Sequence, residues 1–266
     1  MNWQLSSAQF MHLWEATDLD RMPHPFEHRT AARLESELHV EQQRLERWRA
    51  EQPDHQLRDA IAILRHPAVS VSVYSPDTNP VLRRGAVRGG VSVVADQLPS
   101  TTGTGDLRIR VRPGSRAPDL RQFARDILHE LPEVPAGRTA AVDAHPDDLR
   151  ANDPHAESLG NGVLHNATIA GAPLLKRILA RRTAAGYVCL HRPWQGAYDP
   201  IVDSLTWFDV AGDGRYLYYT DQLVRLRSAT TAVLADMLEE RVRKALADNG
   251  AVDRRPSETG HNWSLR

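Results

Sequence analysis

The residues of this chain that could do chemistry are concentrated in two short stretches. One is DAHPDDL at 143–149, where a histidine stands beside several carboxylates, the side-chain types that bind zinc or act as a general base. The other is WFDVAGDGRYLYYT at 207–220, where two aspartates and two glycines interrupt an aromatic run. Each stretch is either a ligand site or a turn, and the residues around it decide which.

The 207–220 stretch has the composition of a turn. A calcium-binding EF-hand loop needs oxygen ligands at positions 1, 3 and 5 and a glutamate at position 12. Counted from Asp209, position 3 is Ala211 and position 12 is Thr220, so this pattern is missing. No Gly-Lys-Ser/Thr follows, which excludes a Walker phosphate loop. Asp213-Gly214 between two aromatic segments instead predicts a tight β-hairpin.

The 143–149 stretch resembles the AHPDD motif of zinc-dependent N-acetylglucosaminyl deacetylases, in which the histidine and one aspartate bind metal and the other aspartate is the base. The resemblance would assign these roles to His145, Asp147 and Asp148. In that family the motif opens the domain, whereas here about 120 residues follow it. No later His-x-x-His supplies a further ligand. The alternative is a short helix that begins at Pro146, with acidic residues in its first turn.

No other catalytic pattern stands out. Twelve histidines are present without an HExxH or His-x-His pair, and no GxSxG elbow occurs. The single cysteine, Cys189, excludes an internal disulfide, and its apolar surroundings favour a small buried side chain over a nucleophile. The sequence therefore predicts no enzyme and no cofactor.

Composition narrows the class of protein further. Lysine and arginine total 33 against 34 acidic residues, which argues against nucleic acid or an anionic membrane as the main ligand. The start of the chain lacks the basic and apolar regions of a signal peptide, and no apolar run approaches the ~20 residues that span a bilayer. We expect a cytoplasmic protein.

Hydrophobic periodicity predicts an α+β protein with a central, mostly antiparallel sheet. A short first strand and a helix capped by Ser6 or Ser7 precede a charged helix over 29–51 and a helix over 55–65. Alternating segments then predict strands; they cover 69–74, 81–87, 91–95, 107–112, 187–192, 204–210, 215–220 and 223–227.

Two halves of the chain end in the same way, with a strand followed by a helix. LRIRVR is followed by a helix that contains Leu120–Leu131, and LVRLR by a last helix that Ser228 can cap. A further helix at 173–182 has Pro173 in its first turn. We therefore predict quasi-twofold halves at 1–134 and 135–247, and a mobile tail at 248–266.

Several motifs in order resemble the EspG family of cytosolic chaperones from actinobacterial type VII (ESX) secretion systems. The N-terminal part is Phe10-x-x-Leu13-Trp14-Glu15 with Asp20-Arg21-Met22-Pro23, followed by AIAILRHPAVSVSV at 60–73. The late part is Asp213-Gly214-Arg215-Tyr216-Leu217. The likeness covers about residues 3–247, and 135–172 departs most from the family.

The resemblance implies a central sheet flanked by two helical bundles, without catalytic residues or a cofactor. It also implies a partner: the exposed helical tip of a PE–PPE-type heterodimer, which the chaperone keeps soluble and delivers to the secretion machinery. The family uses the outer face of its sheet and part of its C-terminal bundle for this contact.

Interfaces of this kind concentrate their binding energy in tryptophan, tyrosine and arginine. On the alternate faces of 81–95 and 204–219 we select six candidate contacts, each of which is equally compatible with a core position: Arg83, Arg84, Arg88, Trp207, Tyr216 and Tyr218. Phe10 and Trp14 are assigned to the core because they share a helix face with Leu13. Two other functions stay open: a small zinc hydrolase at His145, and a generic self-associating regulatory module.

Overall fold

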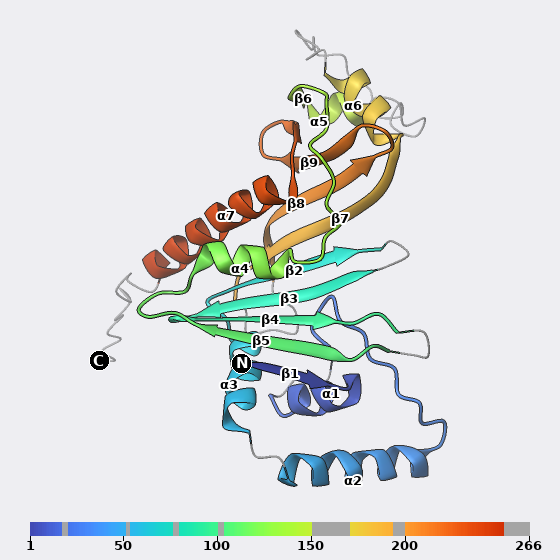
Figure 1. The fold of residues 1–266 in the computed structure, drawn as a ribbon, viewed down its shortest axis with the longest axis vertical. Helices are drawn as coiled ribbons and strands as arrows, with labels where there is room; N and C mark the ends of the chain where they lie inside the picture. The colour runs from blue at the N-terminus through green and yellow to red at the C-terminus, as the bar shows by residue number, and fades with distance from the viewer. Residues whose placement is uncertain are drawn as a thin grey trace, which may run out of the picture.

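The computed structural model describes residues 1–17, 21–51, 54–76, 80–100, 104–150, 171–193 and 200–252. They form one ten-stranded sheet in the order β1-β5-β4-β3-β2-β7-β8-β9-β10-β6, with every neighbouring pair antiparallel (Figure 1). The predicted α+β class with an antiparallel sheet is confirmed. The strands are β1 (Asn2–Leu5), β2 (Val69–Ser75), β3 (Val81–Arg88), β4 (Val91–Gln97), β5 (Leu107–Pro113), β6 (Val142–Ala144), β7 (Arg182–His191), β8 (Ile201–Val210), β9 (Gly214–Thr220) and β10 (Val224–Ser228).

The strand order is the same in both parts of the sheet. In each, four consecutive strands run outward from the middle, and an earlier strand closes the outer edge: β2 to β5 with β1, and β7 to β10 with β6. β2 and β7 pair with each other at the centre. A helix follows the fourth strand in each part, α4 (Leu120–Ile127) after β5 and α7 (Thr231–Val252) after β10.

One face of the sheet is covered by α4 and α7. The alternate valines of β2, Val69, Val71 and Val73, point to this face and form the central core with Phe123 of α4 and Leu234 of α7. Figure 1 shows both helices on the same side, next to the middle strands. We call this side the helix-covered face.

The opposite face is covered only toward its two outer ends. At one end α1 (Ser7–Glu15) lies on β1, α3 (His55–Arg65) packs on β3 and β4, and α2 (Glu35–Glu51) lies against α1, with Phe10, Trp14 and Leu64 buried beneath them. At the other end α6 (Ala172–Leu179) packs on β6, β8 and β10, next to the short α5 (Pro146–Arg150). Between these two groups of helices, Tyr74 of β2 is partly exposed and Tyr187 of β7 is exposed, whereas Ser70 and Ser72 of β2 on the same face are buried.

Local signals explain where most helices begin. Ser6 accepts from the backbone N–H of Gln9, whose side chain accepts in return from the N–H of Ser6, which confirms Ser6 as the cap of α1. Pro173 lies in the first turn of α6, as predicted.

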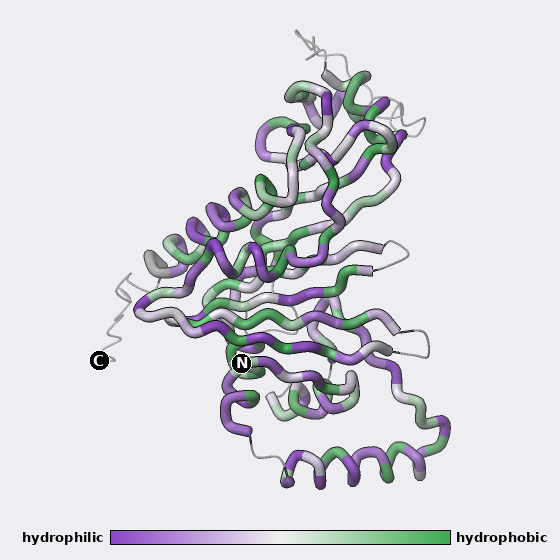
Figure 2. Tube along the Cα trace, in the orientation of Figure 1, coloured by the Kyte–Doolittle hydropathy of each residue, from purple (hydrophilic) through white to green (hydrophobic). Residues whose placement is uncertain are grey.

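Three predicted boundaries are wrong. The charged helix begins at Glu35, because Glu37 accepts from the N–H groups of Arg33 and Leu34 and so caps the helix there. Figure 2 shows how hydrophilic this helix is along most of its length. Thr230, not Ser228, caps α7 through the N–H of Val233. α7 also runs through 248–252, which the sequence assigned to the tail; the remaining tail lies outside the described residues.

Candidate functional site

The middle of the sheet exposes a row of side chains on the face opposite α4 and α7. Because β2 and β7 alternate, Val73 and Val188 are buried under the helices, whereas Tyr74 and Tyr187 point to the other side. The strand register places five residues side by side across five strands: Leu82, Tyr74, Tyr187, Thr206 and Tyr218. We call this set the tyrosine row.

The tyrosine row is accessible. Tyr187 is 45% exposed, and the other four members are partly exposed. The next row, Ser72, Cys189 and Ser204, lies beside it, and Cys189 is partly exposed rather than buried as predicted. Burial raises the pKa of the Cys189 thiol, which lowers its thiolate fraction and its reactivity. A surface of this kind suits the binding of another molecule better than chemistry.

Hydrogen bonds fix the strands beneath this surface. Ser72 Oγ and His191 Nε2 lie 2.8 Å apart between β2 and β7. Arg84 donates to Ser70 Oγ over 3.2 Å and to the carbonyl of His24 over 3.4 Å. Burial and the charge of Arg84 lower the pKa of His24, whose ring lies 6.1 Å from Tyr74. The surface is therefore preorganised, with the chain around His24 at its border.

Of the six candidate contacts, Arg88 and Tyr218 have the accessibility that was expected. Arg88 is exposed at the end of β3, and Tyr218 belongs to the tyrosine row. Their contact with a partner stays a prediction.

The expected outward position of the other four candidates is wrong. Arg83 is 4% exposed on the helix-covered face, where it pairs with Asp96 over 2.7 Å and donates to the carbonyl of Ile127. Desolvation lowers its pKa, and Asp96 opposes that shift. Arg84 is buried under the chain around His24. As neighbours on one strand, the two arginines point to opposite faces of the sheet. Both are nevertheless buried, Arg83 beneath the segment at Ile127 and Arg84 beneath the segment at His24.

Trp207 and Tyr216 are core residues. Trp207 lies on the helix-covered face over Gly186, where an added Cβ would stand 2.1 Å from the indole ring. Tyr216 is fully buried near α6, and its hydroxyl donates to Asp213 over 2.7 Å and accepts from the N–H of Thr139 over 3.0 Å. Neither side chain reaches the surface.

The 207–220 stretch is a hairpin turn, as predicted. Gly212 takes a positive φ of 70° between β8 and β9, a conformation that favours glycine. Asp209 receives two hydrogen bonds from Arg215, at 2.7 and 2.9 Å. Arg215 is fully buried and also donates to Thr231 at the start of α7 over 2.8 Å. Asp209 therefore links the hairpin to the start of α7 through Arg215.

The 143–149 stretch has a helical turn and surface ion pairs. Asp143 on β6 pairs with Arg227 over 2.6 Å, and this hydrogen bond lowers the pKa of Asp143. His145 Nδ1 lies 3.3 Å from Asp147, with both side chains about half exposed. Within the described ranges no three His, Cys, Asp or Glu side chains form a group that could hold a metal ion. His155, His165, His261 and Asp20 lie outside those ranges.

Sequence reasoning missed Tyr74, Tyr187 and Thr206. A signal was present in VSVSVY at 69–74, where valine alternates with serine and then tyrosine. The alternation shows that the serine and tyrosine side chains share a face. It does not show that β7 lies next to β2 and continues the row.

The fold and this surface together define an α+β protein with one antiparallel sheet, covered on one side and exposed around the tyrosine row on the other. The chain belongs to the EspG family, whose family model matches residues 6–240. No curated protein matches it.

Two solved structures from Mycobacterium tuberculosis are similar to the chain. One is the type VII secretion system chaperone EspG5 in complex with the PE25–PPE41 dimer, at 15% identity and a TM-score of 0.57, covering 94% of this chain and 96% of that one. This likeness shows the fold. The other, HtdX, is 15% identical over 62% of this chain and 76% of its own, and its TM-score of 0.14 is too low to support any argument.

Proposed function

We propose that this protein is a type VII secretion chaperone that binds the exposed helical tip of a PE–PPE-type heterodimer. The observation that carries the proposal is the family match over residues 6–240. The EspG5 structure, which has the same fold over nearly the whole chain, was solved with a PE–PPE dimer bound.

The tyrosine row supplies a suitable surface for this task. A helical tip that would otherwise self-associate is partly apolar and needs a partner surface with aromatic groups and a polar surround. Tyrosine offers a rigid apolar ring and a hydroxyl that can form a hydrogen bond, and it is enriched among residues that dominate binding. Tyr74 and Tyr187 lie at the centre of the sheet, between the helices at its two ends.

The proposed role is non-enzymatic and cytoplasmic. A chaperone of this kind must meet its substrate before export, and it needs shape complementarity rather than a reactive group. No helix in the described residues is both long and apolar enough to cross a membrane.

Co-purification from the native host tests the proposal. The tagged chain should bring down a stoichiometric heterodimer of helical PE–PPE-type proteins, identified by mass spectrometry. A monomer or homodimer from cells that express such substrates would contradict the proposal. Zinc bound at one ion per chain, and lost in His145→Ala, would instead support the hydrolase.

A further inference from the structure

The tyrosine row is the accessible middle of a longer row that crosses the whole sheet. The strand register continues it, on the same face, through one residue of each remaining strand. These outer members are Leu5, Leu107 and Gln97 on one side and Leu226 and Val142 on the other, and all five are buried. No member of the row is charged, although 25% of the residues in the chain are. The sheet therefore presents an uncharged strip where its two parts meet.

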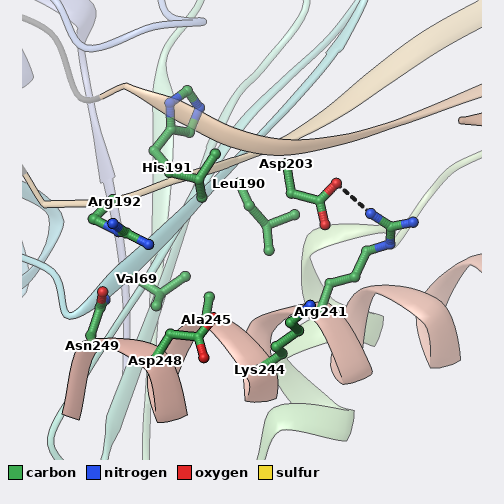
Figure 3. A pocket seen from close by; sticks show the side chains of 11 residues that line it. Val69, Leu190, His191, Arg192, Asp203, Arg241, Lys244, Ala245, Asp248 and Asn249 are labelled. Atoms are coloured by element: carbon green, nitrogen blue, oxygen red, sulfur yellow. Dashed lines mark hydrogen bonds and ion pairs between the residues drawn. The ribbon is translucent and has the colours of Figure 1, made fainter. Parts of the chain in front are cut away.

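The charged side chains of the middle strands lie elsewhere. Asp203 of β8 points to the helix-covered face, where it pairs with Arg241 of α7 beside a pocket (Figure 3). Arg83 of β3 is buried on that face, Arg84 in the adjoining row is 5% exposed, and Arg88 is exposed only at the far end of β3. Among the described residues of these strands, none offers an accessible charge in the tyrosine row or in the rows beside it.

The accessible strip is long across the strands and narrow along them. Ser72, one row from the tyrosine row on β2, is 1% exposed, and so is Phe208, one row away on the other side on β8. The strip widens only toward Cys189 and Ser204. Neighbouring strands lie ~4.8 Å apart, so five strands span about 19 Å, the length of a helix of about 13 residues. These proportions fit one helix placed across the strands.

The row also carries hydroxyl groups that are available to a partner. Four of its five members have a hydroxyl without a hydrogen-bond partner among the described residues: Tyr74, Tyr187, Thr206 and Tyr218. Each hydroxyl can donate to or accept from an amide or hydroxyl of a partner, and the tyrosine rings add apolar contact. A charged side chain placed on this strip would lose water without gaining a counter-ion, which is unfavourable.

We propose that one helix of the partner lies along the tyrosine row, across the strands, and that its contact face carries only uncharged side chains. One helical turn rises ~5.4 Å, close to the strand spacing, so residues three or four positions apart can meet successive strands. Amide, hydroxyl and small apolar side chains suit these positions. A helix with a charge among them is rejected, so the row selects partners as well as binding them. This inference rests on the proposed chaperone function and adds the orientation and chemistry of the bound helix.

Matched substitutions of Thr206 test the exclusion of charge. Thr206→Glu and Thr206→Gln introduce side chains of nearly equal size, so a comparison of the two isolates the effect of charge. The Glu variant should bind the co-purified heterodimer at least about tenfold more weakly than the Gln variant in isothermal titration calorimetry, because its carboxylate is buried without a counter-ion. Equal affinities, or tighter binding by the Glu variant, would overturn the proposal.

The same pair of substitutions at two neighbouring positions tests the orientation. Tyr218 is the next member of the row on β9, whereas Ser204 is exposed beside the row on the same strand as Thr206. The Glu variant of Tyr218 should again bind at least about tenfold more weakly than its Gln variant. At Ser204 the difference should stay under about threefold, since a charge at the border keeps its water. A helix that runs along β8 would reverse these two results and contradict the proposed orientation.

Removal of single hydroxyls tests their contribution. Tyr187→Phe and Tyr218→Phe should each weaken binding about two- to tenfold, the effect of one lost hydrogen bond. Tyr219→Phe is the matched control, because Tyr219 follows Tyr218 on β9 and packs against the core of the helix-covered face. The control should bind like the unmodified chain. If neither variant of the row binds more weakly, the hydroxyls do not contact the partner and that part of the proposal is wrong.

The outcomes separate the two proposals. If the unmodified chain binds the heterodimer and the folded Glu and Gln variants of Thr206 bind alike, this inference is wrong and the chaperone function stands. If the unmodified chain does not bind it, both fail. Thermal melts establish that each variant is folded. If Thr206→Glu does not fold, Tyr187→Glu and Tyr187→Gln at the 45% exposed Tyr187 replace the pair, with the same expected difference and the same contrary result.

Discussion

The two parts of the sheet share a strand order but differ in the helix that follows it. α4, after β5, has eight residues, whereas α7, after β10, has 22 and extends to the start of β2 and the end of β7. The extra length of α7 forms one wall of the pocket in Figure 3. The two parts of the sheet therefore contribute to one central core but differ in the surface beside it. The added turns of α7 shape that surface, and the core does not require them.

Helical cover on the opposite face differs as well. The first part has three helices between β1 and β2, with a core of Phe10, Trp14 and Leu64 against the strands. In the second part, the described residues between β6 and β7 form only α5 and α6. Both groups stop short of the central strands, which leaves Tyr74 and Tyr187 accessible where the two parts meet. We propose that the halves 1–134 and 135–247 act together as one binding surface.

The largest expected effect is a difference in the loss of stability when each of two buried ion pairs, one in each part of the sheet, is broken. Arg215 is the cationic partner of Asp209, and Arg215→Met should lower the free energy of unfolding by about 3–5 kcal/mol, because it leaves a carboxylate uncompensated in the interior. Asp96 in the first part receives Arg108 and Arg110 as well as Arg83. Arg83→Met should therefore cost less, roughly 1–3 kcal/mol. Urea denaturation measures both, and equal losses would contradict this reasoning.

The second prediction concerns binding across the junction of the two parts. Tyr74→Ala and Tyr187→Ala should each weaken heterodimer binding by about tenfold or more, because each removes an aromatic contact from the centre of the surface. Tyr187→Ala should leave the unfolding free energy nearly unchanged, since its side chain is 45% exposed.

Calorimetric titration with each single variant and the double variant tests this. If the partner lies across the junction, both single variants weaken binding and their effects are coupled. An effect of only one tyrosine would confine the contact to one part of the sheet. Tyr216→Phe is the control, because the Tyr216 hydroxyl is buried among Asp213 and Thr139. A loss of binding in this folded control would mean that the assigned surface is wrong.

Sequence periodicity predicts where the strands lie, but it does not predict which side chains form the exposed surface of the sheet. Strands such as 69–74 and 91–95 were located to within two residues, because alternation is a local consequence of the pleat. Arg83 and Arg84 were misplaced because exposure depends on what packs above each face, here Ile127 and the chain around His24. The tyrosine row depends on strand order, which no local pattern contains.

The most specific motifs of the family resemblance serve the fold. Phe10, Leu13 and Trp14 are core residues, as predicted. In Asp213-Gly214-Arg215-Tyr216-Leu217, Arg215 pairs with Asp209 and Tyr216 binds Asp213. These residues identify the family because they hold its hairpin and last helix in place. Most of these side chains are buried, so the motifs give little information about which residues contact a partner.

The smallest expected effect concerns the β8–β9 and β3–β4 hairpins, which occupy corresponding places in the two parts of the sheet. They should differ in how their contribution to stability changes at acidic pH. The β8–β9 turn contains Asp213, whose pKa lies below its ordinary value of 3.8, first because the N–H of Arg138 donates to it and second because the Tyr216 hydroxyl does. The β3–β4 turn, at Gly89 and Gly90, contains no carboxylate. A carboxyl whose pKa is depressed on folding stabilises the folded state above pH 3.8, and this contribution is lost as pH falls through the folded pKa.

Asp213→Asn should therefore reduce the acid sensitivity of unfolding between about pH 5 and pH 2 by under about 1 kcal/mol, since this side chain is partly exposed and its charge is screened. Urea denaturation at a series of pH values measures the difference between the variant and the unmodified chain. Asp148→Asn is the control for the loss of one carboxylate: Asp148 has no ion pair within the described residues, and the effect of Asp213→Asn should exceed the effect of this control. Identical profiles for all three chains would show that the Asp213 hydrogen bonds do not favour the ionised form, and the β8–β9 turn would then differ from the β3–β4 turn in sequence alone.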